Sequence, residues 1–220
     1  MEKNIIFFDL DGTLTDPMIG ITSSVQYALK AYGIMEEDLT KLIPFIGPPL
    51  KNSFMEFYGF PEEQAEEAIY KYREYFAVKG LFENRVYEGI PEMLGQLKKA
   101  GKKLYVATSK PEEFARQILE HFQLDHYFDY IGGASMDEVR VRKGDVIAYT
   151  MEQAGIEDAD RSQMVMVGDR EHDVLGAKEQ HMDCVGVLFG YGPREELEAA
   201  GVWKIAANLD ELTKILLENL

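Results

Sequence analysis

The chain has 220 residues, 46% of them hydrophobic and 28% charged, which is enough for one large domain or for a core with a modest accessory domain. Its net charge is −16, so nucleic-acid polymers and anionic membrane surfaces are poor partners. A single cysteine, no run long enough to span a membrane and no signal-peptide pattern in MEKNIIFFDLD together predict a cytoplasmic protein.

The first predicted element is a buried strand over residues 4–8, a continuous apolar run without alternation. It runs directly into DLDGT at residues 9–13. In a strand, residues two apart face the same side, so Asp9 and Asp11 would direct two carboxylates into one small volume. Two like charges at that distance are costly unless a proton or a cation lies between them.

The next part of the chain, residues 17–85, has helical patterns throughout. One helix is expected to begin at Pro17 after the N-cap residue Asp16, and another at Pro61. This interval is far longer than a simple crossover between parallel strands. We therefore expect a helical domain at 17–85, inserted into a core domain made of residues 1–16 and 86–220. The aromatic residues of the insert are expected to form its own core and surface.

Strands and helices then alternate to the end of the chain. Strands are predicted at residues 103–107, 164–167, 183–187 and 203–206, and helices at 91–100, 111–122, 144–154 and 193–200. This order predicts an α/β fold with a Rossmann-like, doubly wound parallel sheet.

Polar residues follow three of the predicted strands. DLDGT follows the first strand, Thr108 and Ser109 the second, and Gly168-Asp169 the third, with Asp173 four positions later. Ligands of doubly wound sheets bind at the carboxyl ends of the strands, so Asp9, Asp11, Thr108 and Asp169 are expected to converge. Carboxylate and hydroxyl oxygens suit Mg²⁺ better than Zn²⁺.

A magnesium ion held by few protein groups usually also binds water and substrate phosphate. We expect the phosphoryl oxygens to be bound by the free amides of residues 11–13 and by the helix start after Pro111. A positive side chain is available from Lys143, just before the helix predicted at 144–154.

DLDGT at 9–13, Thr108, Lys143 and GDREHD at 168–173 resemble, in order, the four motifs of the haloacid dehalogenase superfamily of phosphohydrolases. The insert resembles the helical cap of the first cap class of that superfamily. The resemblance implies that Asp9 attacks phosphorus and becomes an aspartyl-phosphate, while Asp11 acts as general acid and base.

The same resemblance implies further site residues. Thr108 and Lys143 would also be catalytic, because they would stabilise the phosphoryl oxygens, and Lys143 would offset charge on Asp9. Substrate would be bound by Gly12, Thr13, Thr108, Ser109 and Lys143, and Mg²⁺ by Asp9, Asp11, Asp169 and Asp173. Closure of the cap would exclude water and select the leaving group. The sequence assigns no role to Arg170 or His172.

A closer resemblance, to the 5′-nucleotidase-like branch, rests on IGPPL at 46–50, GDR at 168–170 with Asp173, GAK at 176–178 and GYG at 190–192. It implies hydrolysis of nucleoside 5′-monophosphates. TSKP at 108–111 resembles the phosphoglycolate phosphatase pattern, so phosphoglycolate or another small metabolite is an alternative substrate. The segment departs from that pattern at Ser109, where asparagine is usual.

Two other functions stay open: a phosphomutase on the same scaffold and a non-catalytic domain that binds Mg²⁺ or a partner protein. A dehalogenase is disfavoured because it needs no metal and would not be expected to carry Asp11. The expected partner is a small phosphorylated metabolite, and the expected assembly is a monomer or a weak homodimer.

Overall fold

The structure, a computed structural model, describes residues 2–218. The chain forms two compact units. Unit 1 consists of residues 1–15 and 86–220, and unit 2 of residues 16–85. The predicted cap and core domains differ from these units by one residue at the first crossing, where Asp16 belongs to unit 2.

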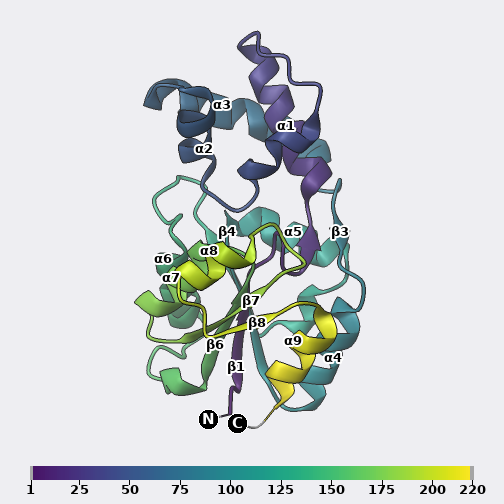
Figure 1. Ribbon diagram of the computed structural model, residues 1–220, viewed down its shortest axis with the longest axis vertical. Coiled ribbons are helices and arrows are strands. Elements are labelled where there is room, and N and C mark those ends of the chain that lie inside the picture. The colour runs from purple at the N-terminus through teal and green to yellow at the C-terminus, as the bar shows by residue number, and fades with distance from the viewer. Residues whose placement is uncertain (1, 219–220) are drawn as a thin grey trace. The chain divides into compact units, whose positions relative to one another are not determined.

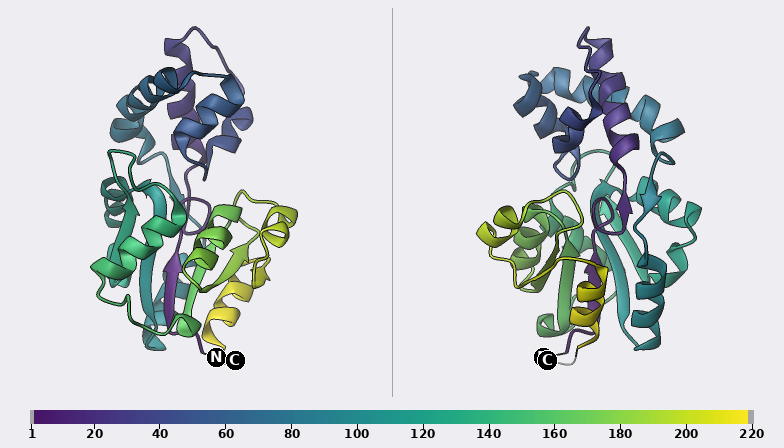
Figure 2. Two further views of the ribbon diagram at one scale, coloured as in Figure 1. Left: turned by 90° about the vertical axis from the view of Figure 1, so that its left-hand side faces the viewer. Right: turned by 45° about the vertical axis from the view of Figure 1, so that its right-hand side comes forward.

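Unit 1 is built on a six-stranded sheet in which every neighbouring pair is parallel, in the order β5-β4-β1-β6-β7-β8. The strands are β1 (Ile5–Phe8), β4 (Lys103–Pro111), β5 (Tyr130–Ala134), β6 (Met164–Gly168), β7 (Asp183–Val187) and β8 (Lys204–Ala206). Figures 1 and 2 show helices on both faces of this sheet. The predicted α/β, Rossmann-like fold class is confirmed.

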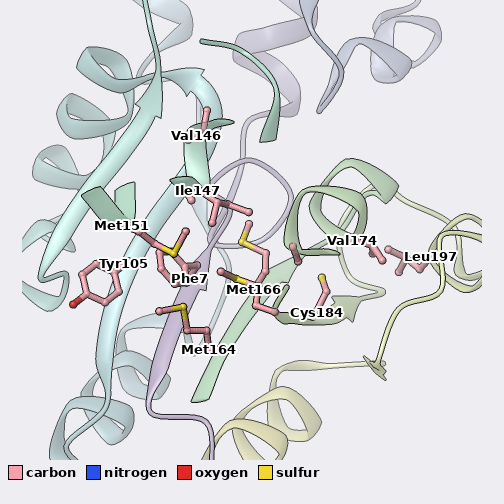
Figure 3. Close-up of a cluster of buried hydrophobic side chains, with 13 residues drawn as sticks. Phe7, Tyr105, Val146, Ile147, Met151, Met164, Met166, Val174, Cys184 and Leu197 are labelled. Carbon is pink, nitrogen blue, oxygen red and sulfur yellow. The ribbon is translucent and has the colours of Figure 1, made fainter. Parts of the chain in front are cut away.

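The helices of unit 1 follow strands in the manner of a doubly wound fold. They are α4 (Ile90–Lys99), α5 (Glu112–His121), α6 (Lys143–Gln153), α7 (Glu171–Glu179), α8 (Arg194–Ala199) and α9 (Leu209–Leu217), with short 3₁₀ turns η3 (Asp125–Tyr127) and η4 (Arg161–Gln163). One face of the sheet packs against α6, α7 and α8 through a cluster rich in methionine (Figure 3).

The central strand β1 determines where the polar residues that follow β1, β4 and β6 lie. Phe8 is paired with Val106 of β4 on one side and with Val167 of β6 on the other. Because the three strands are parallel and in register, the residues that follow them leave the sheet at one edge. Phe7 and Phe8 are fully buried, as expected for a strand covered on both faces.

Unit 2 is helical, as predicted. It contains α1 (Met18–Ala31), η1 (Leu39–Phe45), α2 (Leu50–Tyr58), α3 (Glu62–Tyr75) and the π-helical turn η2 (Phe76–Gly80). The chain crosses between the units at β2 (Thr15–Asp16) and β3 (Arg85–Val86), which form a two-stranded sheet. Both predicted helix starts shift inward, α1 to Met18 and α3 to Glu62, because Pro17 and Pro61 are N-cap residues.

The aromatic side chains of unit 2 divide between its interior and its surface. Phe54, Tyr72 and Phe76 are buried, whereas Phe57 and Tyr70 are exposed. The buried rings belong to the core of unit 2 and the exposed rings to its surface, as expected. Within residues 2–218, no helix combines the length and the apolar character needed to cross a membrane.

The sequence patterns miss three longer elements of unit 1, of which one is helix α7 (Glu171–Glu179), between the strands predicted at 164–167 and 183–187. Strand β5 contains Gly132 and Gly133 and has no apolar run, although it extends the sheet at its edge. Helix α9 lies beyond the last predicted strand and packs against α4 and β8. Strand β4 also continues past the predicted end at Ala107 to Pro111.

Candidate active site

The segment that follows β1 is a tight turn and not a continuation of the strand. Asp9 N still donates to Val167 O (2.9 Å), but strand geometry ends at Phe8. Gly12 has φ +81°, a left-handed conformation that favours glycine, and a Cβ there would overlap the Asp169 carboxylate. The shape of the turn therefore depends on glycine at this position.

The turn uses two of the backbone amides that were expected to bind phosphate. Gly12 N donates to Thr15 O (2.8 Å) and Thr13 N donates to Leu10 O (3.3 Å). The expectation that these two amides are free is therefore wrong, because the turn needs them for its own hydrogen bonds. Thr13 instead directs its hydroxyl towards Asp169, with Oγ1 donating to Oδ1 at 3.4 Å.

The Asp9 carboxylate is buried and held by two donors. Leu10 N lies 2.8 Å from Asp9 Oδ1, and Lys143 Nζ lies 2.9 Å from the same oxygen. Lys143 is the first residue of α6, and its Nζ also donates to Ala107 O at 3.0 Å. The orientation of the Asp9 side chain is thus fixed from two sides.

Three buried acids lie close enough to share one cation. Asp9, Asp169 and Asp173 each offer an oxygen, and these oxygens lie within 4.8 Å of one another. Burial raises the pKa of Asp169 to about 8, and the charges of Asp173 and Asp9 add to the rise. An ionised cluster here is costly without positive charge.

Lys143 supplies part of that positive charge. Its Nζ lies 2.8 Å from Asp173 Oδ1 as well as 2.9 Å from Asp9. Burial raises the pKa of Asp173 and the charge of Lys143 opposes this, so the pKa is about 6. Burial alone would lower the pKa of Lys143, but Asp173 and Asp9 raise it above its usual value, so the side chain stays charged.

Asp11 is not part of the three-acid group. Its Oδ2 lies 2.8 Å from Lys110 Nζ, while its Oδ1 is buried and accepts no hydrogen bond from the described part of the chain. The expectation that Asp9 and Asp11 share one volume depended on strand geometry, which ends before Asp9. In this conformation the Asp11 carboxylate belongs to a separate ion pair, and its role as a metal ligand stays a prediction.

Thr108 and Ser109 lie near the carboxyl end of β4. Thr108 is buried, and its Oγ1 accepts a hydrogen bond from Lys110 N at 3.2 Å. Ser109 is half-buried. The pairing between β4 and β5 shifts between Thr108 and Pro111, so the strand is irregular at this point. Their predicted substrate contacts stay predictions.

The GYG segment at 190–192 encloses Asp169. Tyr191 N donates to Asp169 Oδ2 at 2.7 Å. A Cβ at Gly190 would overlap Gly12 O, and a Cβ at Gly192 would overlap Asp169 O. Glycine is therefore required at both positions by the close approach of the backbone to Asp169.

The start of α7 fixes Asp173 and Arg170. Asp173 Oδ2 accepts from Arg170 N (3.1 Å), an N-terminal capping interaction. Glu196 Oε1 accepts from Arg170 Nε and from Glu171 N, both at 2.8 Å. Arg170, to which sequence analysis assigns no role, therefore joins α7 to α8. His172 is half-buried, and burial lowers its pKa.

Sequence reasoning missed Lys110 as a site residue, as well as the Tyr191 amide and Glu196. The ion pair of Lys110 with Asp11 joins two distant parts of the chain, so no local pattern shows it. For Tyr191 a signal existed, because glycines flank it on both sides.

Comparison with known proteins gives a consistent family. The sequence model of the haloacid dehalogenase-like hydrolases matches residues 6–187. A crystal structure of a predicted phosphatase from Clostridium acetobutylicum is 51% identical, with a TM-score of 0.95 and complete coverage of both chains.

Three curated relatives carry different names. A 5′-nucleotidase of Pseudomonas aeruginosa is 48% identical over 96% of this chain and 94% of its own length. Tyrosine-protein kinase PtkA of Mycobacterium tuberculosis is 41% identical over 98% of this chain and 73% of its own. Phosphoglycolate phosphatase 1 of P. aeruginosa is 30% identical over 94% of this chain and 78% of its own length.

Proposed function

The chain belongs to the haloacid dehalogenase-like hydrolase family, and from this we propose that it is a Mg²⁺-dependent phosphatase that hydrolyses small phosphate monoesters through an aspartyl-phosphate on Asp9. The observation that carries the proposal is the fixed Asp9 carboxylate, held by Lys143 and Leu10 N beside two further buried acids. A buried carboxylate fixed in this way suits attack on phosphorus.

The donor set fits Mg²⁺. Asp9, Asp169 and Asp173 offer only carboxylate oxygens, and their burial and mutual repulsion favour a cation. These residues would hold the ion, with Asp169 oriented by Thr13 and Tyr191 N. When bound, the ion would neutralise charge on the phosphoryl group and on the acids.

The chain's own residues supply the remaining steps. An oxygen of Asp9 forms a bond to phosphorus while the bond from phosphorus to the leaving oxygen breaks, and Asp11 gives that oxygen its proton. Asp11 then takes a proton from water, whose oxygen attacks phosphorus and releases phosphate and free Asp9. Lys143 holds positive charge beside Asp9 throughout, and Thr108 lies near the carboxyl end of the neighbouring strand.

Among substrates, we place nucleoside 5′-monophosphates first. The support is the 5′-nucleotidase relative, whose identity with this chain is higher than that of the phosphoglycolate phosphatase relative. The latter keeps phosphoglycolate as the second candidate, as does TSKP at 108–111. We also propose a cytoplasmic location and a monomer or weak homodimer.

The test is phosphate release with Mg²⁺ from nucleoside 5′-monophosphates, phosphoglycolate and sugar phosphates, with Asp9→Asn measured in parallel. A preference for nucleotides that the variant loses supports the whole proposal. A preference for phosphoglycolate keeps the chemistry and overturns the substrate. Turnover that requires a sugar bisphosphate would indicate a mutase, and transfer from ATP to a protein tyrosine would indicate a kinase. No reaction at all would leave the non-catalytic alternative.

A further inference from the structure

Lys110 forms a buried ion pair with the proposed general acid and base. Its Nζ lies 2.8 Å from Asp11 Oδ2, and only 8% of the Lys110 residue is exposed. The family chemistry assigned above to Thr108 and Lys143 makes no use of this second lysine. Its placement beside Asp11 therefore needs its own account.

The local irregularity of β4 explains how the lysine reaches Asp11. Thr108 is paired with Gly133, and the next pair is Pro111 with Ala134, so Ser109 and Lys110 are extra residues on β4. Such bulges change the direction of side chains at the ends of strands. The hydrogen bond from Lys110 N to Thr108 Oγ1 (3.2 Å) holds the bulge beside the site.

The two oxygens of Asp11 have different surroundings. Oδ2 is engaged by Lys110, whereas Oδ1 is buried and accepts no hydrogen bond from residues 2–218. A buried polar atom that no group of the described chain engages calls for an explanation, and a catalytic role is one of them. A proton on Oδ1 could be donated without breaking the contact between Oδ2 and Lys110.

We propose that Lys110 is a positioning residue that holds Asp11 by Oδ2 and thereby presents Oδ1 to the leaving-group oxygen of the substrate. This inference rests on the proposed phosphatase function. It also predicts which substrates depend on Lys110: those with strongly basic leaving groups, which need a proton as the bond to phosphorus breaks.

The experiment compares kcat/KM for alkyl, phenyl and p-nitrophenyl phosphates in the Mg²⁺-loaded enzyme. For Lys110→Met, we expect a loss of about 10²-fold with the alkyl ester and of less than about threefold with p-nitrophenyl phosphate. Because kcat/KM extends only to the first irreversible step, it isolates leaving-group departure from the later attack of water. An equal loss for all three esters, or none, would overturn the inference.

Two further variants separate positioning from folding. Lys102→Met also removes a buried lysine, paired with Glu2 at 3.0 Å at the opposite end of β4, and should leave the leaving-group dependence unchanged. In an Asp11→Asn background, Lys110→Met should add no further leaving-group dependence, because the lysine acts through Asp11. An additional selective loss in that background would contradict the inference.

The experiment distinguishes a wrong role for Lys110 from a wrong proposed function. If the wild-type protein cleaves none of the three esters and releases no phosphate from any substrate, the proposed function is wrong. If the wild-type protein is active but Lys110→Met, folded by circular dichroism, keeps the wild-type leaving-group dependence, only the role of Lys110 is wrong.

Discussion

Lys143 Nζ lies 2.9 Å from Asp9 Oδ1, and both side chains are almost completely buried. The lysine comes from the first turn of α6 and the acid directly follows β1, so the fold brings them together at the edge of the sheet. A second contact, 2.8 Å to Asp173, makes Lys143 the cation shared by two of the three clustered acids.

Lys143→Met is expected to lower kcat by about 10²–10³-fold, because it removes positive charge beside the phosphoryl group. It should also destabilise the metal-free protein by about 3–5 kcal/mol, since two buried acids lose their partner. Urea unfolding at pH 7 with and without Mg²⁺ measures the second effect. Stability unchanged in both conditions would show that the buried pairs contribute little.

Removal of Mg²⁺ with EDTA should abolish activity, and added Mg²⁺ should restore it. At a concentration 100 times its Kd, Mg²⁺ should stabilise the folded protein by about 2.7 kcal/mol. Asp169→Asn should lose most of this stabilisation, which thermal unfolding detects without any assay of turnover. Restoration by Zn²⁺ in place of Mg²⁺ would contradict the oxygen-only donor set.

Gly192→Ala should weaken Mg²⁺ binding about 10–100-fold, because a methyl group there would overlap Asp169 O and displace the loop that orients this acid. Titration of the metal-free variant by calorimetry measures the change. Gly95→Ala is the matched control, since its methyl group would lie 3.9 Å from Tyr127 Cε1, an ordinary contact. Equal Mg²⁺ affinity in both variants would exclude a role for the loop.

A substitution at Asp129, which is not a residue of the candidate site, tests how the stability of the fold depends on pH. Burial alone would raise its pKa, but hydrogen bonds from Lys98 (2.8 Å), Leu104 N (3.0 Å) and Lys103 (3.2 Å) lower it below the usual value. Because the pKa of Asp129 is lower in the folded state than in the unfolded state, its ionised form stabilises the protein at pH values above the unfolded-state pKa of about 4. This stabilisation is lost as the pH falls through the folded-state pKa.

Asp129→Asn should therefore lower the free energy of unfolding by about 1–2 kcal/mol at pH 7. The difference from the wild-type protein should shrink as the pH falls below about 4. Urea unfolding of both proteins from pH 7 to about 3 measures it. A difference that does not change over this range would mean that the contribution is not that of an ionised carboxylate.

Much of the fold follows from local patterns. The apolar runs at β1 and β6 and the proline and glycine boundaries of α4 are visible in the sequence because burial and turns act over a few residues. Strand β5 is not visible, since its glycines are there for close packing. A Cβ at Gly132 would overlap Thr150 Oγ1, and one at Gly133 would lie 2.5 Å from Glu112 Cα.

The candidate site, like the fold, could be predicted from the sequence only in part. Its acids were found because they follow strands whose carboxyl ends meet at one edge. The separate pairing of Asp11 was not found, because it depends on the turn that begins after Phe8 and on a bulge in β4. Side-chain direction in a tight turn is set by three-dimensional contacts and does not follow the alternation of a strand.

In the proposed mechanism, Asp9 carries the phosphoryl group during turnover. Mass spectrometry of the tryptic peptide 4–30, after the Mg²⁺-loaded enzyme is mixed with a phosphate monoester and quenched in acid, tests this step. We predict the mass of one added phosphoryl group on this peptide, absent in Asp9→Asn, which should also lose turnover. Turnover without a phosphorylated peptide, together with an active Asp9→Asn, would contradict the mechanism.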